Sequence, residues 1–240
     1  MDIRKFTRVA RKGLPLKTCG AVILAAGNAS RMGGTDKIMA PLGGEPVILR
    51  TVRTYQTSDV ISEIVVVTRP DLIVPIMDLC HDFSKVTMVI AGGASRQESA
   101  AIGLDSLSKK VKLVAIQDGA RPLVTHEVID RAVRAANTYG AAAPMIPVKD
   151  TIKVVQGGMV DSTPDRSTLR AGQTPQVFDI DLLRCALTKA EEDGLSLTDD
   201  SAAVERLGMS VKVVEGDERN IKVTTPMDLK LAELLLEEGK

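Results

Sequence analysis

Short apolar runs alternate along the chain with segments whose apolar positions recur every three or four residues. The runs cover residues 21–26, 63–67, 86–90, 112–116, 141–146 and 211–214. Several are apolar on both faces, which is typical of central strands in a parallel sheet that helices cover. The alternation therefore predicts an α/β fold: a Rossmann-like, mostly parallel sheet with helices on both faces.

Capping residues mark the starts of three predicted helices. Pro46 fits the first turn of a helix that ends near residue 55, and Thr125 fits the N-cap of one that ends near residue 137. Pro226 begins a C-terminal helix whose leucines share one face. We expect this last helix to cover the sheet.

The segment 147–172 breaks the alternation. It reads as two short strands around a turn at Gly157 and Gly158. The flanking residues Val154 and Val155 need burial, yet an isolated two-stranded hairpin is marginal in water. We therefore expect this β-arm to pack on another surface, such as a second subunit.

Composition narrows the class of protein. The 31 basic residues balance the 31 acidic ones, so no overall field attracts nucleic acid or an anionic membrane. The apolar runs are far too short to cross a bilayer. The three cysteines, Cys19, Cys80 and Cys185, are far apart and suggest the reduced thiols of a cytoplasmic protein. Residues 1–19 are predicted to be a basic tail that precedes a single domain, 20–240.

A glycine-containing loop follows the first apolar run. Gly27 lets the backbone turn and approach a ligand, and Arg31 and Lys37 are cations suited to phosphate. The loop is neither a Walker A motif nor a dinucleotide fingerprint, because Ile38 follows the lysine and Ala29 replaces the second glycine. On this segment alone, phosphate binding and a plain strand end with solvated cations are equally consistent.

Several motifs together resemble a known family. The run AVILAAGNASRMGGTDK and the following PLGGEPVI resemble the sugar-phosphate nucleotidyltransferases, and within them the 2-C-methyl-D-erythritol 4-phosphate cytidylyltransferases. GGASRQESAAIGL, QDGARPLV, PVKDTIK and NIKVTTPMDL support the narrower match. The resemblance implies formation of 4-diphosphocytidyl-2-C-methyl-D-erythritol and pyrophosphate from CTP and the alcohol phosphate, in the non-mevalonate isoprenoid precursor pathway.

The resemblance also implies where CTP binds. Arg31 and Lys37 would stabilise the transition state and the leaving pyrophosphate. Cytosine and its ribose would be recognised by Ala25, Ala26, Gly27, Gly93 and Ser99. Asp118 follows a strand, and if that strand is next to the first one, its carboxylate lies beside the loop. It would bind Mg²⁺ or another divalent cation, which prefers oxygen ligands.

The second substrate would occupy the remaining residues of the motifs. Arg166 and Lys222 would hold the attacking phosphate, and Arg121, Thr151 and Thr174 would line the substrate pocket. The family supplies its arm residues across a dimer, which implies a homodimer through the β-arm.

Departures from the family's pattern leave alternatives open. The loop has Asn28-Ala29-Ser30 and Asp36-Lys37-Ile38 where the family has other residues, and it is about one residue shorter. Ribitol 5-phosphate is an alternative substrate, and a non-catalytic nucleotide-binding protein is an alternative class. Asp199 and Asp200 are interpreted as helix-capping residues and Arg96 as structural.

Overall fold

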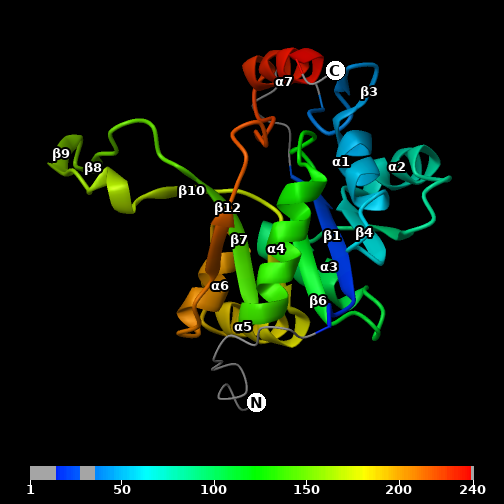
Figure 1. Ribbon diagram of the computed structural model, residues 1–240, viewed down its shortest axis with the longest axis horizontal. Coiled ribbons are helices and arrows are strands. Elements are labelled where there is room, and N and C mark those ends of the chain that lie inside the picture. The colour runs from blue at the N-terminus through cyan, green and yellow to red at the C-terminus, as the bar shows by residue number, and fades with distance from the viewer. Residues whose placement is uncertain (1–14, 28–35, 239–240) are drawn as a thin grey trace.

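One large sheet organises the molecule (Figure 1). The computed structural model describes residues 15–27 and 36–238. In this part of the chain, eight strands belong to the sheet. They are β1 (Cys19–Ala25), β4 (Glu63–Thr68), β5 (Val86–Ala91), β6 (Leu113–Asp118), β7 (Ala141–Pro147), β10 (Arg170–Gly172), β11 (Gln176–Asp179) and β12 (Lys212–Glu215). The strand order is β10-β7-β11-β6-β1-β4-β5, and β12 pairs with β7.

Most of the sheet is parallel, as predicted. β1 pairs in parallel with β4 and β6, β4 with β5, and β7 with β12. The exceptions are β10 and β11, which run antiparallel to their neighbours. The apolar pattern did not predict these two short strands. β10 pairs with the last residues of β7, and β11 lies between β6 and β7. Together the two strands return the chain from the β-arm to the body.

Helices cover both faces of the sheet. Their bounds are α1 (Val47–Gln56), α2 (Ile73–Leu79), α3 (Arg96–Asp105), α4 (His126–Tyr139), α5 (Ile180–Glu192), α6 (Asp200–Arg206) and α7 (Pro226–Glu238). Ala21 and Ile23 of β1 pack in one core with α1, α2 and α4, whereas Val22 packs in the other with α3, α5 and α6. This arrangement explains why the first run is apolar at every position.

The predicted helix starts are confirmed. Pro46 is the N-cap of α1, and the Thr125 hydroxyl accepts a hydrogen bond from the Val128 N–H at the start of α4.

The prediction that the C-terminal helix covers the sheet is wrong. α7 packs on the small hairpin of β2 (Pro41–Leu42) and β3 (Glu45–Pro46), beyond the ends of the sheet strands (Figure 1). Ala232 is its buried residue and joins a cluster with Leu42 and Val223. Leu234, one of the leucines expected to be covered, is 59% exposed. An apolar face predicts that a helix packs, but not against which element.

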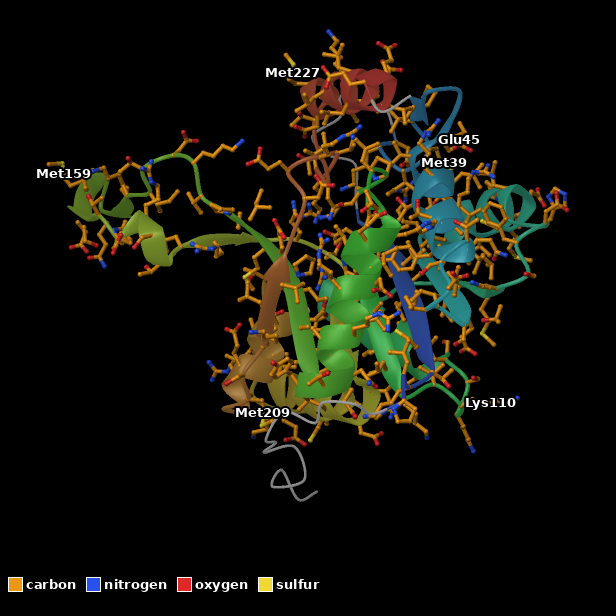
Figure 2. All side chains as sticks on the ribbon, in the orientation of Figure 1. Met39, Glu45, Lys110, Met159, Met209 and Met227 are labelled. Atoms are coloured by element: carbon orange, nitrogen blue, oxygen red, sulfur yellow. The ribbon has the colours of Figure 1, made fainter. Side chains whose placement is uncertain are left out.

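The β-arm forms the predicted hairpin and projects from the body (Figure 1). It leaves the sheet after β7, forms the antiparallel pair β8 (Val154–Gln156) and β9 (Met159–Ser162), and returns through β10. Gly157 and Gly158 have φ values of +56° and +81°, which glycine adopts without strain. Figure 2 shows Met159 at the far end of the arm, and this side chain is 75% exposed. Packing of the arm on a second subunit stays a prediction.

Residues 15–19, which the sequence analysis assigns to the tail, contact the body or belong to it. Cys19 is already the first residue of β1. Lys17 is tied to the body, since its Nζ lies 2.8 Å from Asp179 Oδ2 and its N–H donates to Asn137 Oδ1. Residues 1–14 lie outside the described part, and the division into a tail and a domain stays a prediction. Within the described ranges, no helix is both long and apolar enough to span a membrane.

Candidate active site

A pocket of about 230 Å³ opens at the carboxyl ends of β1 and β6. Leu24 of β1 pairs with Asp118 of β6, so the predicted placement of Asp118 beside the first loop is confirmed. The pocket brings together many of the residues singled out from the sequence: Ala25, Ala26, Gly27, Lys37, Gly93, Ser99, Asp118 and Lys222. They come from five separate stretches of the chain.

Three cations surround the carboxylate of Asp118. Lys222 Nζ lies 2.9 Å from Oδ2, Arg121 Nε lies 3.4 Å from the same oxygen, and Arg96 Nε lies 3.9 Å from Oδ1. Burial acts to raise the pKa of Asp118, but the charges of these partners outweigh it and hold that pKa below its usual value. The site therefore keeps an ionised carboxylate at neutral pH.

Asp118 is compatible with Mg²⁺ only when a second set of oxygens is present. The described residues contain no cluster of three or more histidine, cysteine or acidic side chains that could hold a metal ion by themselves. Mg²⁺ commonly uses one or two carboxylates, with substrate phosphates and water completing its octahedron. A single carboxylate that lines a pocket with room for substrate phosphates fits that second pattern.

Two residues predicted to touch the substrate lie behind Asp118 instead of lining the pocket. The buried Thr174 hydroxyl accepts a hydrogen bond of 3.1 Å from the Asp118 N–H. Arg121 donates to the Asn220 carbonyl at 2.6 Å and pairs with Asp118. Both side chains support the carboxylate, and their contact with a substrate stays a prediction.

The loop before α3 also lines the pocket. Ser99 Oγ accepts from the Gly93 N–H at 3.1 Å and donates to the Ser95 carbonyl at 2.8 Å. Glu98 folds back to accept from the Ala94 N–H at 2.7 Å, while its own N–H donates to Ser95 Oγ. The pattern is close to a capping box, except that Glu98 accepts from the residue before the N-cap residue Ser95. A Cβ on Gly93 would lie 2.2 Å from Glu98 Cδ, so a larger residue there would displace the Glu98 side chain from its hydrogen bond with the Ala94 N–H.

The described end of the first loop is anchored by Asp36. Its carboxylate pairs with Arg69 and accepts from the Ile38 N–H at 2.8 Å. The adjacent Lys37 lines the pocket, and its Nζ lies 3.9 Å from where a Cβ on Gly27 would be. Asp36, a departure from the family's pattern, thus fixes the position from which Lys37 enters the pocket. Arg31 lies outside the described residues.

Arg166 and Thr151 belong to the arm and do not line the pocket. Arg166 is in a single 3-10 turn, Arg166–Thr168, and donates to the Lys149 carbonyl at 2.8 Å. Thr151 is exposed. The chain by itself therefore does not bring these residues to the pocket that holds Asp118.

Sequence analysis gave no functional part to a charged pair at the back of the pocket. Arg96, at the first position of α3, lines the pocket, and its Nη2 lies 2.8 Å from Asp200 Oδ2. Burial raises the pKa of Asp200, against the opposing charge of Arg96. The capping interpretation holds for Asp199, whose carboxylate accepts from the Ala202 N–H at 3.0 Å. The only sequence signal for Arg96 was a positive charge shortly after the two glycines that follow the run 86–90.

Comparison with known proteins agrees with this geometry. The sequence profile of the 2-C-methyl-D-erythritol 4-phosphate cytidylyltransferase family matches residues 19–238. The chain is 44% identical over 225 residues to the enzyme of that name from Caldanaerobacter subterraneus subsp. tengcongensis, covering 90% of this chain and 97% of that one. It is 45% identical over 219 residues to the 2-C-methyl-D-erythritol 4-phosphate cytidylyltransferase from Symbiobacterium thermophilum, covering 90% of this chain and 92% of that one.

Solved structures share the fold. The 4-diphosphocytidyl-2C-methyl-D-erythritol synthase from Anaerococcus prevotii superposes with a TM-score of 0.84 at 31% identity, over 92% of this chain and 96% of that one. The 2-C-methyl-D-erythritol 4-phosphate cytidylyltransferase from Thermus thermophilus gives a TM-score of 0.76 at 33% identity, over 90% and 98%.

Proposed function

Because the chain belongs to the 2-C-methyl-D-erythritol 4-phosphate cytidylyltransferase family, we propose that it joins CTP to 2-C-methyl-D-erythritol 4-phosphate. The products are 4-diphosphocytidyl-2-C-methyl-D-erythritol and pyrophosphate, in the non-mevalonate route to isoprenoid precursors. The observation that carries the proposal is the convergence of the first loop, the Gly93 loop, Asp118 and Lys222 on one pocket.

The reaction requires two anions to be held in line. An oxygen of the alcohol's phosphate attacks the α-phosphorus of CTP, a P–O bond forms, and the bond to the bridging oxygen breaks to release pyrophosphate. A phosphate monoester is already largely ionised near neutral pH, so no general base is needed. The protein's task is to position the anions and to stabilise the charge that develops.

The nucleotide would occupy the pocket between the two loops. The backbone of residues 25–27 and the Gly93 loop would contact cytosine and ribose, with Ser99 fixing the latter loop. Lys37, with Arg31 from the same loop, would stabilise the triphosphate and the leaving pyrophosphate. Asp118 would hold Mg²⁺, which neutralises and orients phosphate oxygens when bound.

Lys222 would hold the attacking phosphate. Its ammonium is paired with Asp118 at 2.9 Å, and its side chain is 40% exposed and lines the pocket. Engagement of the Asp118 carboxylate by the nucleotide complex would free this ammonium for a second anion.

The β-arm would complete the site from a second copy of the chain. Its apolar residues Val155, Met159 and Val160 are 56%, 75% and 61% exposed, more than an arm without a partner surface would favour. A homodimer would cover them and bring Arg166 and Thr151 to the partner's alcohol phosphate. Such a dimer, working in the cytoplasm on small phosphorylated substrates, accounts for both the arm and the balanced charge.

A direct assay tests the proposed reaction. Purified protein is incubated with CTP and Mg²⁺ and with either 2-C-methyl-D-erythritol 4-phosphate or ribitol 5-phosphate, and pyrophosphate release is followed. The methylerythritol substrate is expected to give the larger kcat/KM. A larger value for ribitol 5-phosphate would contradict the substrate, and CTP binding without turnover of either would contradict catalysis.

A further inference from the structure

A buried carboxylate, Asp200, lies behind the pocket and has no part in the chemistry described so far. It is the first residue of α6 and only 1% exposed. A buried carboxylate is strongly unfavourable unless a cation and hydrogen bonds compensate it. The identity of its partner is therefore informative.

That partner faces the nucleotide pocket. Arg96 Nη2 lies 2.8 Å from Asp200 Oδ2, and Arg96 Nε lies 3.9 Å from Asp118 Oδ1. Asp200, Arg96 and Asp118 thus form a line from the core to the pocket, in which the guanidinium stands between two carboxylates. The closer contact is with the buried one.

The backbone around Asp200 is fixed by one side chain of β11. Gln176 Oε1 accepts from the Asp200 N–H at 3.1 Å and from the Ser201 N–H at 3.0 Å, while its Nε2 donates to Asp199 Oδ2 at 2.7 Å. Two residues earlier, Thr174 accepts from the Asp118 N–H. One short segment of the chain therefore sets the positions of both carboxylates that flank Arg96.

We propose that Asp200 is a positioning residue for the nucleotide half of the site. It holds the Arg96 guanidinium away from Asp118 and directed at the triphosphate, for which a planar, permanently charged fork is well suited. Without Asp200 as its closer partner, Arg96 is drawn to the remaining carboxylate, Asp118. It then competes for the oxygens that the Mg²⁺–CTP complex needs. This inference rests on the proposed function, because it assumes that CTP occupies the pocket.

The isosteric variant Asp200→Asn tests the proposal. CTP affinity in the presence of Mg²⁺, measured by calorimetry, is expected to fall by about tenfold to a hundredfold. Losses of this size are typical when a residue that orients a binding group, without touching the ligand itself, is removed. KM for CTP should rise in step, whereas KM for the alcohol phosphate should change little. Unchanged CTP affinity would overturn the proposal.

The matched control is Asp105→Asn. Asp105 is also an aspartate paired with an arginine, Arg184, with Nε 3.3 Å from Oδ1, but the pair is exposed and lies outside the pocket. CTP affinity should equal that of the unmodified protein. An equal loss in both variants would show a general charge effect and would overturn the proposal.

A double-mutant cycle tests whether Asp200 acts through Arg96. Arg96→Gln combined with Asp200→Asn should bind CTP no more weakly than Arg96→Gln alone, because the positioned group is already gone. Additive losses would overturn the proposal. If Asp200→Asn does not fold, Arg96→Lys takes its place. This variant keeps the positive charge but loses the planar guanidinium that lies between Asp200 and Asp118. CTP affinity equal to that of the unmodified protein would overturn the proposal.

The inference can fail without the proposed function failing. An active protein whose CTP affinity is the same in Asp200→Asn would remove the role of Asp200 only. A protein that neither binds CTP nor turns it over would contradict the proposed function itself.

Discussion

The pocket and the β-arm carry the predicted site residues in opposite ways. In the pocket, Asp118 is 8% exposed, paired with cations and supported from behind by a buried threonine. In the arm, the residues of β8 and β9 are all exposed, and Arg166 contacts only its own arm's backbone among the interactions described. The pocket is therefore formed within one chain, whereas the arm residues Arg166 and Thr151 do not line it.

This difference agrees with the proposed division in which the pocket binds CTP and the arm contributes to binding of the alcohol phosphate. A site that must distinguish cytosine and orient a triphosphate benefits from preorganised groups on a rigid sheet. In the proposed dimer, the exposed apolar residues of the arm would pack on the partner subunit and so place Arg166 and Thr151 at the second substrate. Variants in the two regions should therefore differ in what they impair.

The largest effect is expected at Lys222, where the two halves meet. Lys222→Ala should lower kcat/KM by about 10²–10³-fold, because it removes the cation that is proposed to hold the attacking phosphate. Lys230→Ala, which removes an exposed lysine of α7, is the control and should leave steady-state rates unchanged. A loss at Lys222 below tenfold would remove this residue from the site.

The single carboxylate predicts that metal binding depends on nucleotide. With Mn²⁺ as a paramagnetic substitute, the protein alone should leave the signal of the free ion nearly unchanged, because Asp118 is already paired with cations. Protein and a non-hydrolysable CTP analogue together should bind more ion than the analogue alone. Tight Mn²⁺ binding without nucleotide that is lost in Asp118→Asn would contradict this account.

A smaller effect is expected from the support behind the carboxylate. Thr174→Val leaves the buried Asp118 N–H without its acceptor and should lower the free energy of unfolding by about 1–3 kcal/mol, measured by urea titration. Thr163→Val, on the exposed arm, should change it by less than about 0.5 kcal/mol. Equal changes in the free energy of unfolding would mean that the hydrogen bond of Thr174 does not stabilise the fold more than an exposed hydroxyl does.

The smallest effect compares two glycines of similar conformation. Gly140 ends α4 with φ +88°, and Gly158 turns the arm with φ +81°; neither has an atom within 4 Å of an added Cβ. Gly140→Ala should cost about 1 kcal/mol of global stability. Gly158→Ala strains a hairpin outside the cores and should leave unfolding of the body almost unchanged. A similar loss in both would show that the arm unfolds with the core.

The sequence alone predicted the frame of the fold well, for a physical reason. Runs such as 21–26 are buried on both faces and must be apolar throughout, so they are recognisable. β10 and β11 are only three and four residues long and follow the arm directly, so no local pattern separates them from it. α7 shows the opposite limit, because its pattern is clear but its packing partner depends on the whole chain.

The site was predictable where motifs are contiguous and not where partners are distant. Gly93, Ser99 and Lys222 were found through short motifs that resemble a family. The pairing of Arg96 with Asp200 joins the starts of two helices far apart in sequence, and each residue has an ordinary local explanation. Arg166 is a different case, because its predicted role requires a second chain.

The division between pocket and arm is tested most directly by subunit complementation. Lys222→Ala and Arg166→Ala chains carrying different tags are co-expressed, and the mixed dimers are compared with each variant alone. If the arm acts on its partner's pocket, each mixed dimer contains one intact site, so a random mixture should recover about one quarter of wild-type activity. Activity no higher than that of the separate variants, in mixed dimers that are shown to form, would contradict the account.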